Sequence, residues 1–240
     1  MLYKMKKNLN QKLIDLVEYY NLINTNLRLS DTPIKRSVES ETITFSGTKP
    51  QKLENLKKNI KLIKNCALKK NAKNLVFGTG NINSKIMIIG EGPGAQEDVE
   101  GIPFVGRAGK LLDKMLGSIQ LDRTKVYISN VVNYRPPANR KPTESEIAKY
   151  LPYLKSHIQI INPRIIMLLG STALNALIGN EVVISKARGR WIQKEIGKIK
   201  PWVIASFHPA FLMRQPEQKK LAWIDLKMIR EKIKNIKIIV

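Results

Sequence analysis

Two carboxylates and an aromatic ring stand on one glycine-rich loop of this sequence. Residues 90–109 read GEGPGAQEDVEGIPFVGRAG and place Glu91, Glu97 and Phe104 directly after the apolar run 86–89. Glycines let the backbone approach a ligand closely and expose its N–H groups. A loop that only held phosphate would not carry two acids. The pattern therefore indicates chemistry on a ligand that needs negative charge, backbone donors and a flat surface for stacking.

Two further segments combine polar and rigid residues in the same way. NVVNYRPPANRKP covers residues 130–142, and HPAFL covers residues 208–212. Each of the three segments follows an apolar run that is typical of a buried strand. If these strands are parallel, their carboxyl ends meet at one edge of the sheet, and the three loops face one crevice.

The alternation of strands and helices along the chain predicts the elements that position these loops. Apolar runs predict strands at 85–89, 126–132, 164–169 and 202–205, and helical periodicity predicts helices at 109–119, 144–161, 171–178 and about 216–235. Such alternation is typical of a three-layer α/β/α fold with a central, mainly parallel sheet.

The amino-terminal part of the chain differs from this core. Residues 8–25 have helical periodicity, and residues 28–50 are polar, contain Ser, Thr, Gly and Pro, and are typical of a flexible linker. A basic amphipathic helix follows at about 51–65. We therefore expect an amino-terminal helical extension with its linker at 1–50 and an α/β domain at 51–240.

The charge of the chain points to a polyanionic partner. There are 42 basic and 19 acidic residues among 240, a formal net charge of +23, which favours nucleic acid. An anionic membrane surface is the alternative, because the carboxyl-terminal KMIREKIKNIKIIV has basic amphipathic character. No apolar run approaches the roughly 20 residues that span a bilayer. There is no evident secretory signal, and a single cysteine excludes an intramolecular disulfide, so we expect a cytoplasmic protein.

Three blocks of the sequence together resemble one family. GEGPGAQEDVEGIPFVGRAGKLLDKML, VYISNVVNYRPPANRKPTESEI and SFHPAFLMRQPEQKKLAWIDL are similar to the signature blocks of the family 4 uracil-DNA glycosylases, a branch of the uracil-DNA glycosylase superfamily. The resemblance covers about 65–226. It implies a monomeric, monofunctional enzyme that flips uracil out of double- or single-stranded DNA and hydrolyses its N-glycosidic bond, initiating base-excision repair.

The resemblance also implies roles for individual residues. Catalytic roles fall on Glu91, Glu97 and His208; contacts to uracil fall on Gly92, Phe104 and Asn130; contacts to DNA fall on Arg135, Arg140, Pro209, Phe211, Leu212 and Arg214. In this assignment Phe104 stacks on the base, and Asn130 hydrogen-bonds its edge, since an amide carries both a donor and an acceptor. His208 donates toward uracil O2 as negative charge develops there.

Simpler structural roles stay open for the same residues. Phe104 can be an ordinary core aromatic, and Asn130 a turn residue at the end of a strand. Glu91 and Glu97 can cap loops or form ion pairs, and the sequence does not divide the catalytic work between them. A non-catalytic DNA-binding module that kept the fold is the alternative function.

The chain departs from the family at its iron site. Family 4 members hold a 4Fe–4S cluster through four cysteines, and the matching positions here are Ile63, Cys66, Tyr134 and Tyr150. A cubane cluster needs about four thiolates, so we expect no cluster and no other cofactor. The hypothesis is that apolar and aromatic packing by Ile63, Tyr134 and Tyr150 replaces the iron.

Overall fold

A six-stranded sheet with the order β1-β3-β2-β4-β6-β5 forms the centre of the computed structural model, which describes residues 43–179 and 182–239. The four inner strands are parallel: β2 (Ile86–Gly90), β3 (Tyr127–Asn130), β4 (Ile165–Leu169) and β6 (Trp202–Ser206). They match the four predicted strands. The edge strands β1 (Thr79–Gly80) and β5 (Trp191–Gln193) are antiparallel to their neighbours and were not predicted from the sequence.

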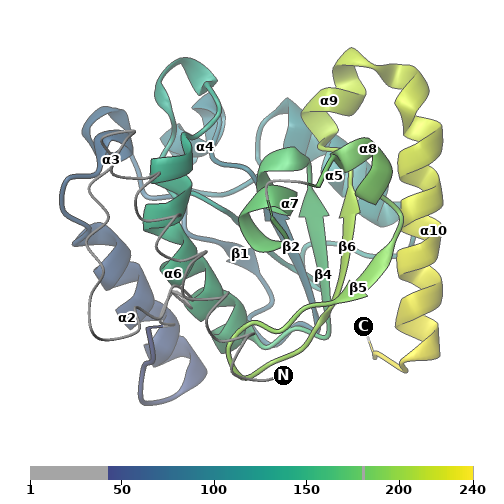
Figure 1. Ribbon diagram of the computed structural model, residues 1–240, viewed down its shortest axis with the longest axis horizontal. Helices are drawn as coiled ribbons and strands as arrows, with labels where there is room; N and C mark the ends of the chain where they lie inside the picture. The colour runs from purple at the N-terminus through teal and green to yellow at the C-terminus, as the bar shows by residue number, and fades with distance from the viewer. Residues whose placement is uncertain (1–42, 180–181, 240) are drawn as a thin grey trace, which may run out of the picture. The chain divides into compact units, whose positions relative to one another are not determined.

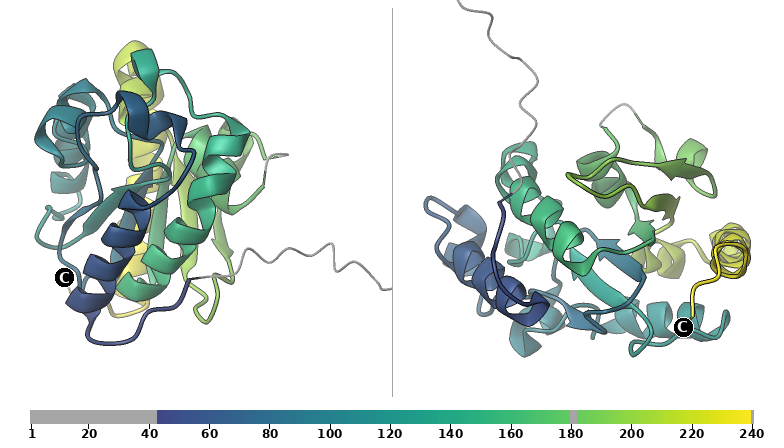
Figure 2. Two further views of the ribbon diagram at one scale, coloured as in Figure 1. Left: turned by 90° about the vertical axis from the view of Figure 1, so that its left-hand side faces the viewer. Right: turned by 90° about the horizontal axis from the view of Figure 1, so that it is seen from below.

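Alternate residues of the inner strands face two separate hydrophobic layers. Met87 and Ile89 of β2 pack with α2 (Lys49–Lys61), α6 (Glu144–Ile161) and α7 (Ser171–Leu177). Ile86 and Ile88 of the same strand pack with α5 (Arg107–Gly117), α9 (Pro209–Arg214) and α10 (Lys219–Asn235). Figures 1 and 2 show helices on both faces of the sheet. The predicted three-layer, mainly parallel α/β fold is therefore confirmed.

Most predicted helices are present with small shifts at their ends. The helix predicted at 51–65 is α2, which starts earlier because Thr48 caps it, its amide donating to Gln51 Oε1 at 2.9 Å. The helix at 144–161 is α6, which ends where Asn162 takes a left-handed backbone, φ 54°. The remaining short helices, none of them predicted, are α3 (Ala67–Asn71), α4 (Ala95–Glu100), α8 (Ile184–Ala187), and the 3-10 turns Pro137–Asn139 and Pro216–Gln218.

The first 42 residues lie outside the described part of the chain. The helix expected at 8–25 and most of the linker expected at 28–50 fall there, so the domain division at residue 50 remains a prediction. Within the described residues, no helix is both long and apolar enough to cross a membrane.

Candidate active site

A cavity lies at the carboxyl edge of the sheet, where β2, β3 and β6 end. Its volume is about 190 Å³, below the roughly 300–1,000 Å³ of pockets for drug-sized ligands, so it suits a small ring. All six of the predicted catalytic and base-contacting residues line it. The lining consists of Glu91, Gly92, Pro93, Gly94, Glu97, Phe104, Ala108, Asn130, Pro136, Asn139, Arg140, His208 and Ala210.

Asn130 is the last residue of β3 and is 2% exposed. Its Oδ1 is buried and has no hydrogen-bond partner among the described residues. Buried polar atoms are nearly always paired, so an unpaired acceptor in the wall of a cavity indicates a ligand that donates. Gly90 makes this arrangement possible, because a Cβ atom there would lie 2.5 Å from both Asn130 Oδ1 and Phe104 Cζ.

Phe104 has a left-handed backbone, φ 56°, which is unfavourable for a bulky residue. Its ring is buried, and the ring centroid lies 5.6 Å from that of His208. Arg123 fixes the peptide: its guanidinium donates to the Phe104 carbonyl and, at 3.1 Å, to the Pro103 carbonyl. Arg123 is itself held by Asp113, with 2.8 Å between Nε and Oδ1. These contacts fix the orientation of the aromatic ring over the cavity.

His208 caps α9, and its ring nitrogen Nδ1 accepts a hydrogen bond from the Ala210 amide at 3.2 Å. Burial, and secondly the positive charge of Arg214, lower the pKa of His208 to about 4. The imidazole is therefore neutral near pH 7. Since Nδ1 is the acceptor, the proton resides on Nε2, and the cavity is lined by a neutral N–H donor.

The two carboxylates have different surroundings. Glu97 is buried, and each of its oxygens accepts from a backbone amide, Gly94 at 3.1 Å and Gly106 at 2.8 Å. It thus ties the start of α4 to the segment before α5. Glu91 accepts from the Thr172 hydroxyl through Oε2, and its Oε1 accepts no hydrogen bond from the residues that the structure describes. Glu91 is the carboxylate with a free oxygen.

The residues predicted to contact DNA are spread around the cavity rim and beyond it. Arg135 donates to Asn139 Oδ1 at 2.8 Å, and Arg140 makes a bidentate ion pair with Glu146 at 2.7 Å. Arg140 lowers the pKa of Glu146 to about 2. Arg140 also lines the cavity, so this loop presents one guanidinium group there, whereas Arg135 is not among the lining residues.

The segment after His208 is more deeply packed than an exposed tip would be. Pro209 is buried, and Leu212 is 1% exposed within the core layer of α5 and α10. Phe211 is half-buried against Phe207, with 4.9 Å between ring centroids. Arg214 is exposed and lines a neighbouring hollow of about 570 Å³ with Glu91 and His208. The structure brings Ala210, rather than Leu212, to the cavity.

The positions that match the family's iron ligands meet in one buried cluster. Ile63, Cys66, Tyr134 and Tyr150 are 9%, 7%, 6% and 1% exposed, and all belong to the core layer of α2 and α6. The Cys66 thiol and the Tyr150 hydroxyl are hydrogen-bonded at 3.1 Å. Burial, and secondly the neighbouring Cys66, raise the pKa of Tyr134. Within the described residues no three His, Cys, Asp or Glu side chains are grouped as metal ligands. This donor set does not fit a 4Fe–4S cluster.

Thr172 and Arg123, which hold Glu91 and the Phe104 backbone in place, are among the residues that the sequence analysis missed. Thr172 follows β4, the fourth strand that ends at this edge, and the strand-end rule used for the other loops was sufficient to identify it. Arg123 had no such signal, because a guanidinium that binds main-chain carbonyls leaves no pattern in the sequence.

Comparisons with known proteins agree with this site and fold. The sequence profile described as "Uracil DNA glycosylase superfamily" matches residues 77–227. The "Type-4 uracil-DNA glycosylase" of Thermotoga maritima is 41% identical over 191 residues, 78% of this chain and 98% of that protein. The protein of the same name from Archaeoglobus fulgidus is 38% identical over 75% of this chain and 93% of its own length. A third protein of this name, from Sulfurisphaera tokodaii, is 42% identical over 75% of this chain and 84% of its own length. The chain is a member of the uracil-DNA glycosylase superfamily and, within it, of the type-4 family.

The packing of Phe104 against α5 gives a test by stability. A Cβ atom at Gly109 would lie 1.8 Å from the Phe104 carbonyl oxygen, whereas a Cβ at Gly117 of the same helix meets nothing within 4 Å. We expect Gly109→Ala to destabilise the protein by about 1–3 kcal/mol or more. The matched variant Gly117→Ala should stabilise it by about 0.5–1 kcal/mol. Urea unfolding measures both. Equal effects of the two substitutions would contradict the close approach of Phe104 to α5.

Proposed function

We propose that this chain is a monofunctional uracil-DNA glycosylase that hydrolyses the N-glycosidic bond of a uracil flipped out of DNA. The observation that carries the proposal is the unpaired, buried Oδ1 of Asn130 in a small cavity beside Phe104 and His208. The similarity to type-4 uracil-DNA glycosylases supports the same substrate. A non-catalytic DNA-binding module is not favoured, because the cavity retains both an unpaired acceptor and a neutral imidazole donor.

Recognition of uracil follows from the groups in the cavity. Phe104 offers its ring face for stacking, and Gly92, which has no side chain, lines the same cavity. Uracil donates through N3–H, so it satisfies Asn130 Oδ1. Cytosine has a bare N3 acceptor at the same place and leaves the buried oxygen unpaired, which is costly. The selectivity for uracil over cytosine therefore arises chiefly at Asn130.

Bond cleavage needs stabilisation of two opposite charges. As the bond between C1′ and N1 breaks, its electron pair leaves with uracil, and positive charge develops on the sugar. His208 donates Nε2–H to uracil O2 and stabilises the anion without giving up its proton. Glu91, with a free carboxylate oxygen, stabilises the sugar cation and orients the water whose oxygen bonds to C1′. The carboxylate takes up the proton that this water loses and releases it to solvent, and the departed uracil anion takes a proton from solvent. Glu97 acts by holding the loop through its two backbone contacts.

The remaining assignments concern the DNA strand. Arg135, Arg140 and Arg214 contact phosphates around the cavity. Pro209 and Leu212 anchor α9, so that Phe211 and its neighbours stand at the space left by the flipped base. The substrate is uracil-containing DNA, single- or double-stranded, and the enzyme acts as a cytoplasmic monomer.

Replacing His208 tests the donor separately from the helix cap. His208→Asn keeps an oxygen that can accept from the Ala210 amide but lacks a donor at the Nε2 position. We expect both His208→Asn and His208→Ala to lower the single-turnover rate of uracil release by about 10²–10³-fold, and only His208→Ala to lose about 1 kcal/mol of stability. Because the pKa of His208 is about 4, its protonation should not limit the wild-type rate above about pH 5. A full rate in His208→Asn would refute the role.

Arg123 is a positioning residue for Phe104 in this proposal. Arg123→Met should lower kcat/KM for a uracil oligonucleotide by roughly 10-fold or more and weaken inhibition by free uracil, because the stacking ring loses its fixed peptide. In a Phe104→Ala background the same substitution should have little further effect. Lys200→Met, which removes an exposed ion pair with Glu195, is the control. Equal losses in both backgrounds would show that Arg123 does not act through Phe104.

We also propose that the protein is active without iron. Purified anaerobically, the protein should contain no stoichiometric iron. It should also lack the broad charge-transfer absorption that a cluster has at about 400 nm. Uracil release should persist in the presence of an iron chelator. One cluster per chain would overturn this proposal and would require ligands other than the residues at 63, 134 and 150.

A further inference from the structure

A second hollow, rich in lysine, lies beside the loop that carries Arg135. Its volume is about 690 Å³. Lys57 and Lys61 of α2 line one side, and Lys69 and Lys73, on α3 and just after it, line another. No acidic side chain is among its lining residues. We call this feature the lysine hollow.

The four lysines of this hollow lack acidic partners. Among the residues that the structure describes, the ion pairs involve other side chains. Lys57 and Lys61 are four residues apart on one helix face, and like charges at this spacing repel. Lys69 lies on α3 and Lys73 follows the end of that helix, so these two lysines reach the hollow from different backbone segments. The Lys69 ammonium donates to the Lys61 carbonyl, which carries no charge. Four cations around one hollow, with no carboxylate among its lining residues, favour a polyanionic ligand.

The chain connects the lysine hollow to the candidate active site. Tyr134 lines the hollow, and Pro136, two residues further along, lines the active-site cavity. Two residues span at most about 7 Å, so the two sites flank a single short segment. Helix α3, which carries Lys69, lies at the end of the domain where the inner strands have their carboxyl ends (Figure 1). A DNA strand whose flipped nucleotide occupies the cavity therefore passes next to the hollow.

We propose that the lysine hollow binds the phosphate backbone of the DNA strand on one side of the flipped uracil. This inference rests on the proposed function, because the hollow would bind nucleotides next to the uracil in the same DNA substrate. Flexible lysines contact phosphates as point charges without reading sequence, so the hollow adds affinity and leaves the choice of base to the cavity.

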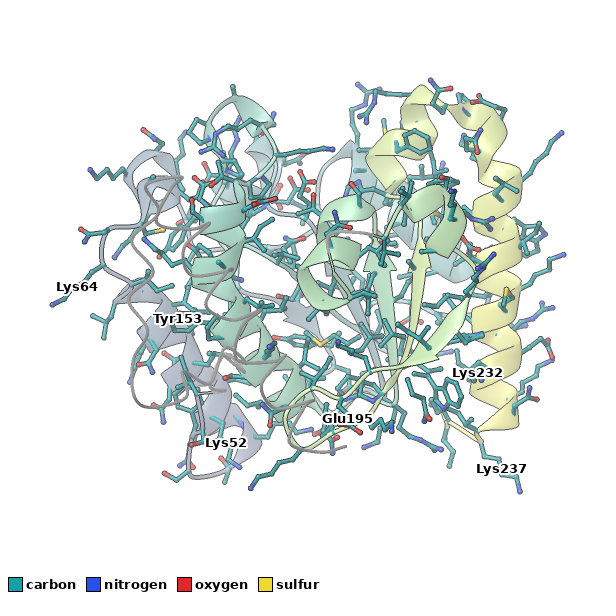
Figure 3. The ribbon with its side chains drawn as sticks, viewed as in Figure 1. Lys52, Lys64, Tyr153, Glu195, Lys232 and Lys237 are labelled. Atoms are coloured by element: carbon teal, nitrogen blue, oxygen red, sulfur yellow. The ribbon has the colours of Figure 1, made fainter. Side chains whose placement is uncertain are left out.

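The salt dependence of binding tests this directly. A variant with Lys57, Lys61, Lys69 and Lys73 all changed to Gln is compared with the wild type for binding to a single-stranded oligonucleotide that carries an abasic-site analogue. Each lost phosphate contact reduces the slope of log K against log salt concentration by about 0.7. We expect a reduction of at least about 1.4, the value for two contacts. The same number of lysines changed at the other end of the molecule (Lys52, Lys198, Lys200 and Lys237) should leave the slope unchanged; Lys52 and Lys237 are seen there in Figure 3.

Shortening the oligonucleotide locates the contact. If the hollow binds one flank, removing nucleotides on that side should abolish the difference between the variant and the wild type, and removal on the other side should preserve it. The inference is overturned if the slope is unchanged, or if the difference between the variant and the wild type is the same whichever flank is shortened. An acidic protein partner would then be the explanation for the four lysines. If the wild type binds DNA but releases no uracil, the proposed function fails while the binding comparison still decides the role of the hollow.

Discussion

The site depends on a close approach at Gly90, the last residue of β2. A side chain there would occupy the space of both Asn130 Oδ1 and the Phe104 ring. Because Gly90 has none, an amide from the neighbouring strand and an aromatic ring from the following loop meet across one backbone position. The parallel pairing of β2 with β3 sets Gly90 opposite Asn130. The register of two strands thus decides where the unpaired acceptor lies.

Several charged or polar side chains around this position form hydrogen bonds with backbone groups. Glu97 accepts from two amides, Arg123 donates to two carbonyls, and His208 Nδ1 accepts from Ala210. Each fixes a loop that has little regular structure of its own. Preorganisation of this kind lowers the cost of arranging groups when the substrate binds. Phe104 keeps its unfavourable left-handed backbone only because its surroundings hold it there.

The sequence was sufficient to predict the parallel core and the loops that meet at its edge. It was insufficient to predict the contacts of the individual side chains in those loops. Runs such as 86–89 are apolar and β-branched enough to indicate buried strands, and strand ends then indicate the shared edge. The two-residue β1 and the three-residue β5 are too short to produce a pattern. A motif does not tell whether Glu97 or Leu212 contacts a ligand or packs within the protein. Only the hydrogen bonds and the burial in the structure distinguish the two roles. The same strand-end rule could have predicted Thr172, which follows β4, but it could not have predicted Arg123.

The buried group of Ile63, Cys66, Tyr134 and Tyr150 has a mechanical consequence for the site. In a cluster-containing relative, iron–sulfur bonds would join the segments that carry these four positions. Here the segments are joined by burial and by the Cys66–Tyr150 hydrogen bond. Tyr134 lies one residue before Arg135, so the packing of its ring fixes the root of the loop that borders both the cavity and the lysine hollow. Hydrophobic packing is non-directional, whereas a cubane imposes four fixed ligand directions. The packing of the Tyr134 and Tyr150 rings therefore contributes to the position of this loop.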